Sequence, residues 1–257
     1  MQSSSHNFNH LPNNCVVLPG AQAVVTFAEK EYFSPGDGDA VPITYKGKSF
    51  NYIPWGSDDK YPQKIVEHVY SNPTMARSME FNIVAMFGKG IRPVLKTDKG
   101  LEELPDNAEV KLFFDKNDLN TWYLEQCTDL MHFYNTFSAL RLSVDGSKIT
   151  NLDHLEAAFS RLQERNKKGI VENHIYCPYF GTDESPNDEN VEVSPVLFPK
   201  NLADFLRGAT GRLSAATKDS KKRRFVVPVN FPTAGRIYYQ RPYWTSVINS
   251  GWLEFAN

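Results

Sequence analysis

The stretch PQKIVEHVYSNPTMARSMEFNIVAMFGKG, residues 62–90, decides the fold because it predicts two helices in direct succession. Pro62 suits the first turn of a helix, where its missing N–H would have no intrahelical partner. The apolar residues that follow fall on one helical face: Ile65, Val66 and Val69. The first helix is therefore predicted over residues 61–71.

A second helix start follows at once, with Asn72 as the N-cap and Pro73 in the first helical position. The apolar residues of this helix are Met75, Met79, Phe81, Ile83 and Met86. Gly88 and Gly90 are the candidates for its end, since glycine adopts the left-handed conformation that closes many helices. The sequence thus predicts two helices joined by a tight Ser-Asn-Pro junction.

Short extended pieces precede the helical pair, at residues 23–27, 43–45 and 50–53. Turn signals separate them, namely the Pro-Gly-Asp-Gly-Asp stretch at 35–39 and the Lys-Gly-Lys stretch at 46–48. These pieces predict a small antiparallel sheet.

A polar link at residues 97–109 and then a third helix, from about Asn120 to Asn135, are expected after the helical pair. The helix carries apolar residues at helical spacing: Trp122, Tyr123, Cys127, Leu130, Met131 and Tyr134. Alternating apolar residues flank Asp145-Gly146, a dipeptide typical of hairpin turns. A hairpin is therefore predicted around residues 140–149.

The last hundred residues mix extended and loop signals. Residues 152–162 are compatible with a helix or a strand, whereas 170–177 indicate a strand after a turn at 166–169. The remaining expectations are an acidic loop at 181–194, a short helix around 202–206, and extended pieces at 225–227 and 236–239. The predicted fold class is α+β, with helices packed on antiparallel strands.

Composition narrows the function classes. Of 257 residues, 41% are apolar and 23% charged, which excludes wholesale disorder. The formal charge of −2 provides no global attraction to nucleic acid, so any DNA contact has to be local. The N-terminus lacks the pattern of a secretory signal, and no apolar run is long enough for a bilayer. Three widely spaced cysteines indicate reduced thiols and no disulfide framework.

Motifs for known chemistries are missing from the sequence. There is no phosphate-binding loop, no dinucleotide fingerprint and no nucleophile elbow. His6 and His10 lie four apart but in a polar tail, and the other four histidines are isolated, so no zinc site is predicted. Cys127 lies on an apolar helical face and is interpreted as a core residue. No catalytic, cofactor-binding or metal-binding residue is predicted.

Two charged clusters allow more than one interpretation. Asp58 and Asp59 could bind a metal, but their place in a turn before Pro62 favours hydrogen bonding to backbone amides. The basic run from Lys218 to Arg224 could contact DNA phosphates through Lys221, Lys222, Arg223 and Arg224. The more favoured interpretation of the run is a solvated loop or a strand edge guarded by lysine.

Three stretches, taken in order, carry a resemblance to a known family. The first is residues 50–62, with Trp55, Gly56, Asp58, Tyr61 and Pro62, followed by the helical pair and its Gly88-Lys89-Gly90 stop. The second is the helix at 120–135 with the hairpin after it. The third is residues 236–244, with Tyr238, Tyr239 and Pro242 ahead of an incipient helix. Together they resemble portal proteins of tailed phages and prophages of Bacteroides-type bacteria.

The resemblance covers roughly residues 43–257 and implies a structural role for its motif residues. Asp59 stands where the family pattern usually has Asn. The implied organisation is a flexible arm at 1–20, an α+β body resembling a portal wing at 21–243, and the start of a stem-side helix at 244–257. Family members continue into a stem and clip, so the resemblance implies a truncated N-terminal portion, a single domain of a longer protein or a divergent short relative.

The implied function is that of a structural subunit, without enzymatic activity, in a homo-oligomeric ring, commonly a dodecamer, at one vertex of the capsid. Double-stranded DNA passes through such a ring during packaging and ejection. The implied partners are the terminase, capsid and head-tail connector proteins, and the implied location is the virion, with assembly in the host cytoplasm. No membrane association is expected.

Two alternatives remain open at this stage. A nucleic-acid-binding module using the Lys218–Arg224 run predicts a DNA affinity that falls steeply with salt. An enzyme with a site scattered through the fold has no support in the sequence, and a metal bound at Asp58 or Asp59 would favour it.

Overall fold

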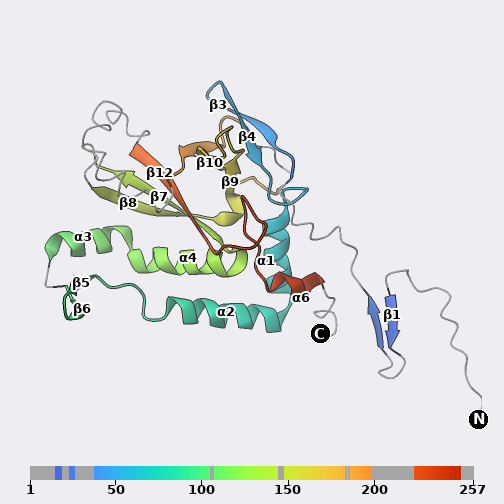
Figure 1. Ribbon diagram of the computed structural model, residues 1–257, viewed down its shortest axis with the longest axis horizontal. Helices are drawn as coiled ribbons and strands as arrows, with labels where there is room; N and C mark the ends of the chain where they lie inside the picture. Colours follow the sequence, from blue (N-terminus) through green and yellow to red (C-terminus); the bar gives the residue numbers. More distant parts are fainter. Residues whose placement is uncertain are drawn as a thin grey trace, which may run out of the picture. The chain divides into compact units, whose positions relative to one another are not determined.

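The computed structural model describes residues 15–18, 23–26, 38–104, 107–143, 148–182, 184, 186–197 and 223–249. The chain divides into two compact units, one formed by residues 35–242 and the other by 1–34 together with 243–257. The larger unit is a mixed α+β structure whose named strands all pair antiparallel (Figure 1), as the sequence predicts.

The predicted helical pair is confirmed. Helix α1 spans Tyr61–Ser71 and helix α2 spans Pro73–Phe87. The side chain of Asn72 accepts a hydrogen bond from the Met75 N–H at 3.0 Å, as an N-cap does. Gly88, with a φ of +58°, ends α2 through a bond from its N–H to the Val84 carbonyl.

The third predicted helix is α4, Leu119–Phe133, and it ends two residues earlier than expected. Tyr134 turns the chain with a φ of +57°, and Asn135 already begins strand β7. The polar link predicted at 97–109 was wrong. It contains most of a hairpin, β5 (Val94–Thr97) with β6 (Gly100–Glu103), and the start of helix α3 (Ala108–Asn117). Both elements have few buried residues, so their apolar pattern is weak.

Two antiparallel sheets form the centre of the larger unit. The first has the order β12-β7-β8, from Arg224–Asn230, Asn135–Leu142 and Ile149–Leu155. The β7–β8 pairing confirms the predicted hairpin, although its turn at 144–147 lies outside the described residues. The ambiguous stretch 152–162 is extended apart from the short 3-10 turn η1, Ala157–Phe159.

The second sheet has five strands in the order β11-β10-β9-β4-β3. Their bounds are Glu192–Pro195, Asn173–Tyr176, Ser160–Gln163, Lys48–Ile53 and Val41–Tyr45. The predicted antiparallel pieces at 43–45 and 50–53 pair with each other in β3 and β4. The piece near residue 23 belongs elsewhere, because β2 pairs with β1 in the other unit.

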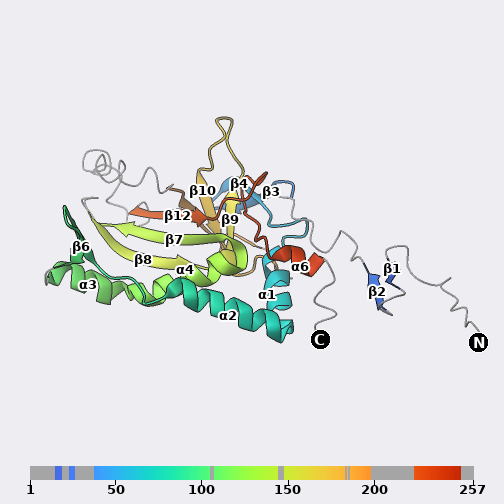
Figure 2. The same ribbon diagram turned by 60° about the horizontal axis from the view of Figure 1, so that its bottom comes forward.

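The layers follow from which faces are apolar. Helix α4 lies along the three-stranded sheet, and α2 runs beside α4 on the side away from that sheet (Figures 1 and 2). Phe137 of β7 meets His174 of β10, with ring centroids 5.0 Å apart, so the two sheets pack on each other. One core cluster lies on the five-stranded sheet and includes Ile43, Tyr52, Ile175, Cys177, Phe180 and Val191.

Three further expectations can be compared with the structure. The extended piece at 225–227 is confirmed within β12, whereas 236–239 has no strand and was predicted wrongly. Tyrosine side chains, not backbone pairing, hold 236–239, because Tyr238 and Tyr239 hydrogen-bond to strand β9 and its continuation. The predicted loop at 181–194 ends in strand β11, and the helix predicted at 202–206 lies outside the described residues.

The smaller unit contains a two-stranded hairpin, β1 (Cys15–Leu18) with β2 (Ala23–Thr26), and the short helix α6 (Thr245–Asn249). Strand β1 falls within the stretch expected to be an arm, and α6 falls where a helix was expected to begin. Among the described helices, none is both long and apolar enough to cross a bilayer.

Candidate functional site

The family-motif aromatics converge on Trp55, which is only 4% exposed. The ring of Trp55 stacks on Tyr239 at a centroid distance of 4.5 Å and lies 6.2 Å from the ring of Tyr61. Phe133, at the end of α4, meets the same indole edge-on at 5.6 Å. Motif residues separated by more than 170 positions in sequence are thus brought together in one buried cluster.

A buried ion pair closes this cluster. Arg161 on β9 is fully buried, and its Nε lies 2.6 Å from Asp59 Oδ1. The Nη2 of Arg161 donates to the Asp59 carbonyl at 3.1 Å, and Nη1 donates to the carbonyls of Ala158 and Ser160. Burial raises the pKa of Asp59, while the charge of Arg161 opposes this rise. Sequence reasoning missed Arg161, because nothing in its local pattern separates it from a surface arginine.

The two acidic residues before Pro62 hold the turn through backbone amides, as predicted. Asp59 Oδ1 accepts from the Trp55 N–H at 2.7 Å, and Asp58 Oδ1 accepts from the Lys60 N–H at 3.2 Å. Asp59 has a φ of +58°, a conformation in which Asp and Asn are enriched among non-glycine residues. Asp and Asn are therefore both suited to position 59.

The C-terminal tyrosines connect strands by hydrogen bonds. The Tyr239 hydroxyl donates to the Ile53 carbonyl at 2.7 Å and accepts from the Leu162 N–H at 2.9 Å, so it bridges β4 and β9. The Tyr238 hydroxyl accepts a hydrogen bond from the Arg165 N–H at 3.0 Å. Pro242, which follows three residues after Tyr239, is buried. The two tyrosine hydroxyls thus attach the C-terminal stretch to strands β4 and β9 and to the residues after β9.

Two of the motif glycines are required by the backbone and its surroundings. Gly56 has a φ of +87°, and a Cβ there would lie 3.0 Å from the Cβ of Tyr61. Gly90 has a φ of +75°, and a Cβ there would overlap the side-chain oxygen of Asn120. That oxygen accepts from the Ile91 N–H at 3.1 Å, so Gly90 lets the chain after α2 approach α4.

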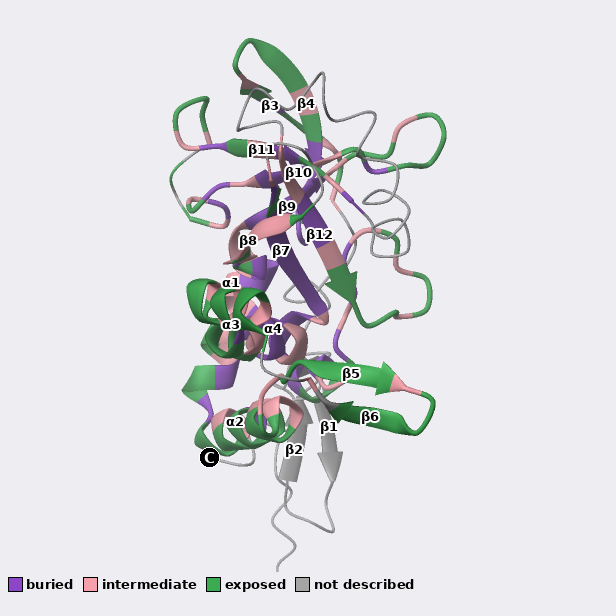
Figure 3. Ribbon diagram, turned by 90° about the vertical axis from the view of Figure 1, so that its left-hand side faces the viewer, coloured by how far each residue is buried: buried purple, intermediate pink, exposed green. Residues whose placement is uncertain are grey.

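Helix α2 presents an uncovered apolar surface. Of its 15 residues only Met79 is buried, while Phe81 is 73% and Val84 58% exposed. The following elements repeat this pattern, with Leu101 of β6 72% and Leu112 of α3 67% exposed. Figure 3 shows α2, β5 and β6 as largely exposed. Single exposed apolar residues are ordinary, whereas neighbouring ones such as Phe81 and Val84, three positions apart on one helical face, form the kind of surface that a partner can cover.

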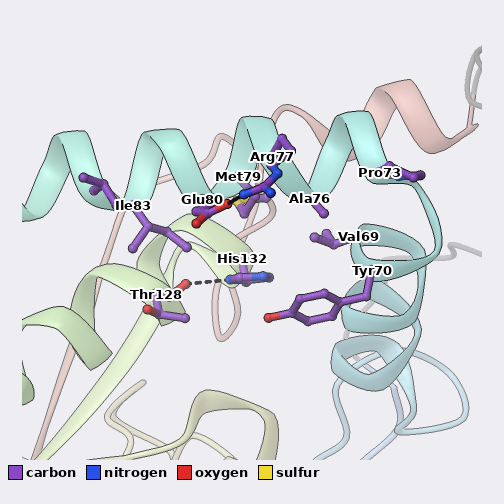
Figure 4. A pocket seen from close by; sticks show the side chains of 11 residues that line it. Val69, Tyr70, Pro73, Ala76, Arg77, Met79, Glu80, Ile83, Thr128 and His132 are labelled. Carbon is purple, nitrogen blue, oxygen red and sulfur yellow. Dashed lines mark hydrogen bonds and ion pairs between the residues drawn. The ribbon is translucent and has the colours of Figure 1, made fainter.

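A cavity of about 450 Å³ lies where α1, α2 and α4 meet (Figure 4). Its walls are mostly apolar, with Val69, Met79 and Ile83 among them. Figure 4 shows His132 between Thr128, whose carbonyl is 2.8 Å from His132 Nδ1, and the ring of Tyr70. His132 is 4% exposed, and no described residue hydrogen-bonds to its Nε2.

Two further cavities, of about 300 and 340 Å³, adjoin the first along α4 and strand β8. They share Glu125, His154 and Glu156, and the carboxylates that line them are Asp118, Glu125, Asp129, Asp153 and Glu156. We call these two cavities the acidic trough. Among the described residues, neither lysine nor arginine lines it.

A chain of side-chain hydrogen bonds orients the deepest carboxylate of the trough. Thr136 donates to Gln126 Oε1 at 2.5 Å, and Gln126 Nε2 lies 2.6 Å from His154 Nδ1. The other ring nitrogen of His154, Nε2, lies 3.2 Å from Asp129 Oδ2. The Ala157 N–H also donates to this oxygen, at 2.7 Å. His132 and His154 were predicted to be isolated, and the structure brings both to the trough.

The sequence carried only a faint signal for the trough. Glu125, Asp129 and His132 share one face of α4 at spacings of four and three, which places them together on a helix. Their partners on β8 and after it are known only from the tertiary structure.

The basic run is only partly described. Lys221 and Lys222 lie outside the described residues, while Arg223 precedes β12 and Arg224 begins it. Arg224 forms an ion pair with Glu192, and its side chain is 16% exposed. Arg224 therefore has an acidic protein partner at the edge of the sheet, in keeping with the strand-edge interpretation of the run.

The described residues offer little for catalysis. Cys127 and Cys177 are fully buried, and burial raises the pKa of both thiols, which disfavours the reactive thiolate. No group of three or more His, Cys, Asp or Glu side chains in the described part of the chain could hold a metal ion. The exposed side of α2 and the acidic trough are the surface features that stand out among the described residues.

Comparison with known proteins assigns no family to the chain, since neither a family model nor a curated protein matches it.

Proposed function

We propose that this chain is a structural subunit of a phage portal ring, the channel at a capsid vertex through which double-stranded DNA is packaged and ejected. The subunit acts through assembly and not through catalysis. Its partners in this proposal are further copies of itself, the terminase, capsid proteins and head-tail connector proteins. It assembles in the host cytoplasm and remains in the virion.

The exposed apolar side of α2 is the observation that supports a subunit role best. Helix α2 is more apolar in composition than α1, α3 or α4. Its side chains Phe81 and Val84 nevertheless remain exposed to water. Burial of a Phe or Val side chain contributes about 1.5–3 kcal/mol, so a partner that covers both gains appreciable free energy. Interface cores are enriched in such aromatic residues.

The Trp55 cluster supports the family resemblance on which the channel function rests. The resemblance was carried by residues 50–62 and 236–244, which are far apart in sequence. Trp55, Tyr61 and Tyr239 from these stretches pack on one another. The two stretches that carry the resemblance therefore contribute to one structural cluster.

Light scattering coupled to size-exclusion chromatography, followed by negative-stain imaging, tests the proposal. We expect a ring-shaped oligomer with a central hole. The variant Phe81→Ser/Val84→Ser should elute as smaller species while keeping its circular dichroism spectrum, because these side chains contribute little to the subunit core.

A matched control is Ile237→Ser, which replaces an apolar residue that is 54% exposed and does not belong to α2. It should assemble as the unsubstituted chain does. The ring proposal would be contradicted if the unsubstituted chain stayed monomeric in light scattering at all concentrations.

The DNA-binding alternative stays a prediction for Lys221, Lys222, Arg223 and Arg224. It requires an affinity for DNA that falls steeply with salt and is lost when these four residues are neutralised. Since Arg224 already pairs with Glu192, we expect its neutralisation to change DNA binding least.

A further inference from the structure

We propose that the hairpin β5–β6 of one copy of this chain packs into the apolar cavity between α1, α2 and α4 of the next copy. The inference rests on the proposed ring and names one contact between neighbouring subunits. The contact is head-to-tail, because the hairpin of one copy meets a different surface, the cavity, of the other.

The hairpin is a projecting element without a core of its own. Its two strands pack on each other, and no other described helix or strand packs extensively against them. Three of its aliphatic side chains nevertheless face water, since Val94 is 48%, Leu95 45% and Leu101 72% exposed. An isolated two-stranded hairpin is at best marginally stable in water, so a surface that covers these side chains stabilises it.

One face of the hairpin combines apolar side chains with a lysine. Val94 and Lys96 alternate with Leu95 along β5, so the first two point to the same side. Leu101 pairs directly with Lys96 across the hairpin, which places it on that side too. Lys96 is exposed and has no hydrogen-bond or ion-pair partner among the described residues. This face therefore suits an apolar surface that has a carboxylate beside it.

The cavity between the helices is such a surface. Its volume of about 450 Å³ falls within the range of about 300–1,000 Å³ that is usual for pockets that enclose a ligand. Val69, Met79 and Ile83 provide apolar walls, and Glu80 lies beside them (Figure 4). Val84 lines the cavity as well, so the cavity is continuous with the exposed apolar side of α2 that supports the subunit role.

Glu80 gives the cavity a charge that complements Lys96. Its side chain is 61% exposed, and its Oε2 pairs with Arg77 at 2.6 Å, whose side chain is 81% exposed. An ion pair so exposed contributes little, and a carboxylate accepts bonds from further donors. The ammonium group of Lys96 from a second copy thus finds a carboxylate next to the apolar walls.

The position of the hairpin favours a second copy as the source of the contact. Figures 1 and 2 show β5 and β6 beyond the C-terminal end of α2, and no described residue of the hairpin lines the cavity of its own subunit. A copy that donates its hairpin therefore still presents its own cavity. Repetition of such a contact generates a ring or an open chain of subunits.

Charge reversal on each side of the contact tests the proposal. Lys96→Glu brings two carboxylates together, and Glu80→Lys brings two ammonium groups together. Each should raise the concentration for half-assembly by about tenfold, as measured by light scattering at several concentrations. Lys111→Glu and Glu67→Lys are the matched controls, because both residues are exposed and lie outside the hairpin and the cavity. The controls should assemble as the unsubstituted chain does.

Mixing the two charge-reversed proteins shows whether the contact joins different chains. Each hairpin in the mixture meets an oppositely charged cavity on the other protein, so an equimolar mixture should regain assembly. A contact within one chain is not restored by mixing. Recovery would support the proposal, whereas no recovery, or normal assembly of either variant alone, would overturn it.

Disulfide trapping separates this inference from the ring itself. Leu101→Cys/Val84→Cys places one cysteine on the hairpin and one on the cavity wall. Mild oxidation should give a ladder of dimers, trimers and larger species on a non-reducing gel, and neither single substitution should give this ladder. Dimers without larger species would indicate a two-fold contact and overturn the proposal.

The two proposals fail in distinguishable ways. If the unsubstituted chain stays monomeric in light scattering, the ring proposal fails, but a ladder from the double cysteine variant still supports the hairpin contact. A ring that forms without any ladder overturns the hairpin contact and leaves the ring proposal standing. Circular dichroism and urea unfolding of every variant show that folding is retained.

Discussion

At the scale of single residues, the most constrained position is Arg161. Its guanidinium is fully buried, pairs with Asp59 and lies 4.7 Å above the ring of Phe180 and 5.9 Å from that of Trp55. Every N–H direction that is described leads to Asp59 or to a carbonyl of η1 and β9. Such a pair adds little net stability as a whole, but losing one partner leaves a charge buried without compensation.

We therefore predict that Asp59→Ala lowers the free energy of unfolding by about 3–5 kcal/mol. Asp59→Asn should cost less than Asp59→Ala, because the amide oxygen still accepts from the Trp55 N–H and from the Arg161 guanidinium, although it no longer balances the arginine charge. Urea unfolding at neutral pH, followed by circular dichroism, measures both.

The control is Asp58→Ala at the neighbouring position. Asp58 pairs with Lys64 at 2.6 Å, the same distance as the buried pair, but its side chain is 46% exposed. Exposed pairs contribute at most about 1 kcal/mol. Equal losses for Asp58→Ala and Asp59→Ala would contradict the role given to burial.

At the scale of elements, Asn72 determines how α1 passes into α2. It is 3% exposed, and its side chain caps α2 at the Met75 N–H. The junction leaves a single residue between the two helices, so the cap also sets the angle at which α2 leaves α1.

Asn72→Ala should lower the free energy of unfolding by about 1 kcal/mol, the usual loss for a removed N-cap. Asn72→Ser should retain part of it, since a hydroxyl oxygen accepts the same bond without burying a charge. Asn107→Ala is the comparison, because Asn107 caps α3 in the same way but α3 buries no residue. Thermal or urea unfolding should show a smaller loss for Asn107→Ala, and the reverse order would contradict this account.

At the scale of the whole molecule, His174 lies where the two sheets pack. It is 1% exposed, and its ring contacts that of Phe137. Neither ring nitrogen has a hydrogen-bond partner among the described residues. Burial, with the charges of Arg224 and Arg161 as smaller causes, lowers the pKa of His174 to about 3. The neutral form of His174 is therefore the one that the folded protein favours at neutral pH.

This pKa makes global stability depend on pH. The unfolded chain takes up a proton at His174 below about pH 6.5, whereas the folded chain does so only near pH 3. Stability is thus fully present above about pH 6.5 and falls as the pH decreases toward 3. Between pH 6 and 5 the unsubstituted chain should lose about 1 kcal/mol more than His174→Leu, as measured by urea unfolding. Parallel pH curves for the two proteins would contradict the prediction.

The sequence by itself determined those elements that depend on capping and turn residues within a few positions of one another. Asn72-Pro73 predicted the helical junction, Gly88 the end of α2, and Asp145-Gly146 the pairing of β7 with β8. Each depends on backbone conformation and capping, which neighbouring residues control. The hairpin β5–β6 and helix α3 escaped prediction because few of their side chains are buried, so periodicity was weak.

The tertiary structure alone decided the partners of distant residues. Trp55 stacks on Tyr239, Arg161 pairs with Asp59, and Asp129 meets His154 through contacts that span from 25 to 184 positions of sequence. From the sequence alone, Arg161 could equally be a surface arginine and His154 an isolated histidine. The charge and polarity of a residue do not reveal which residues will contact it in the folded chain. Burial, and with it the cost of an unpaired charge, arises only when the sheets and helices pack.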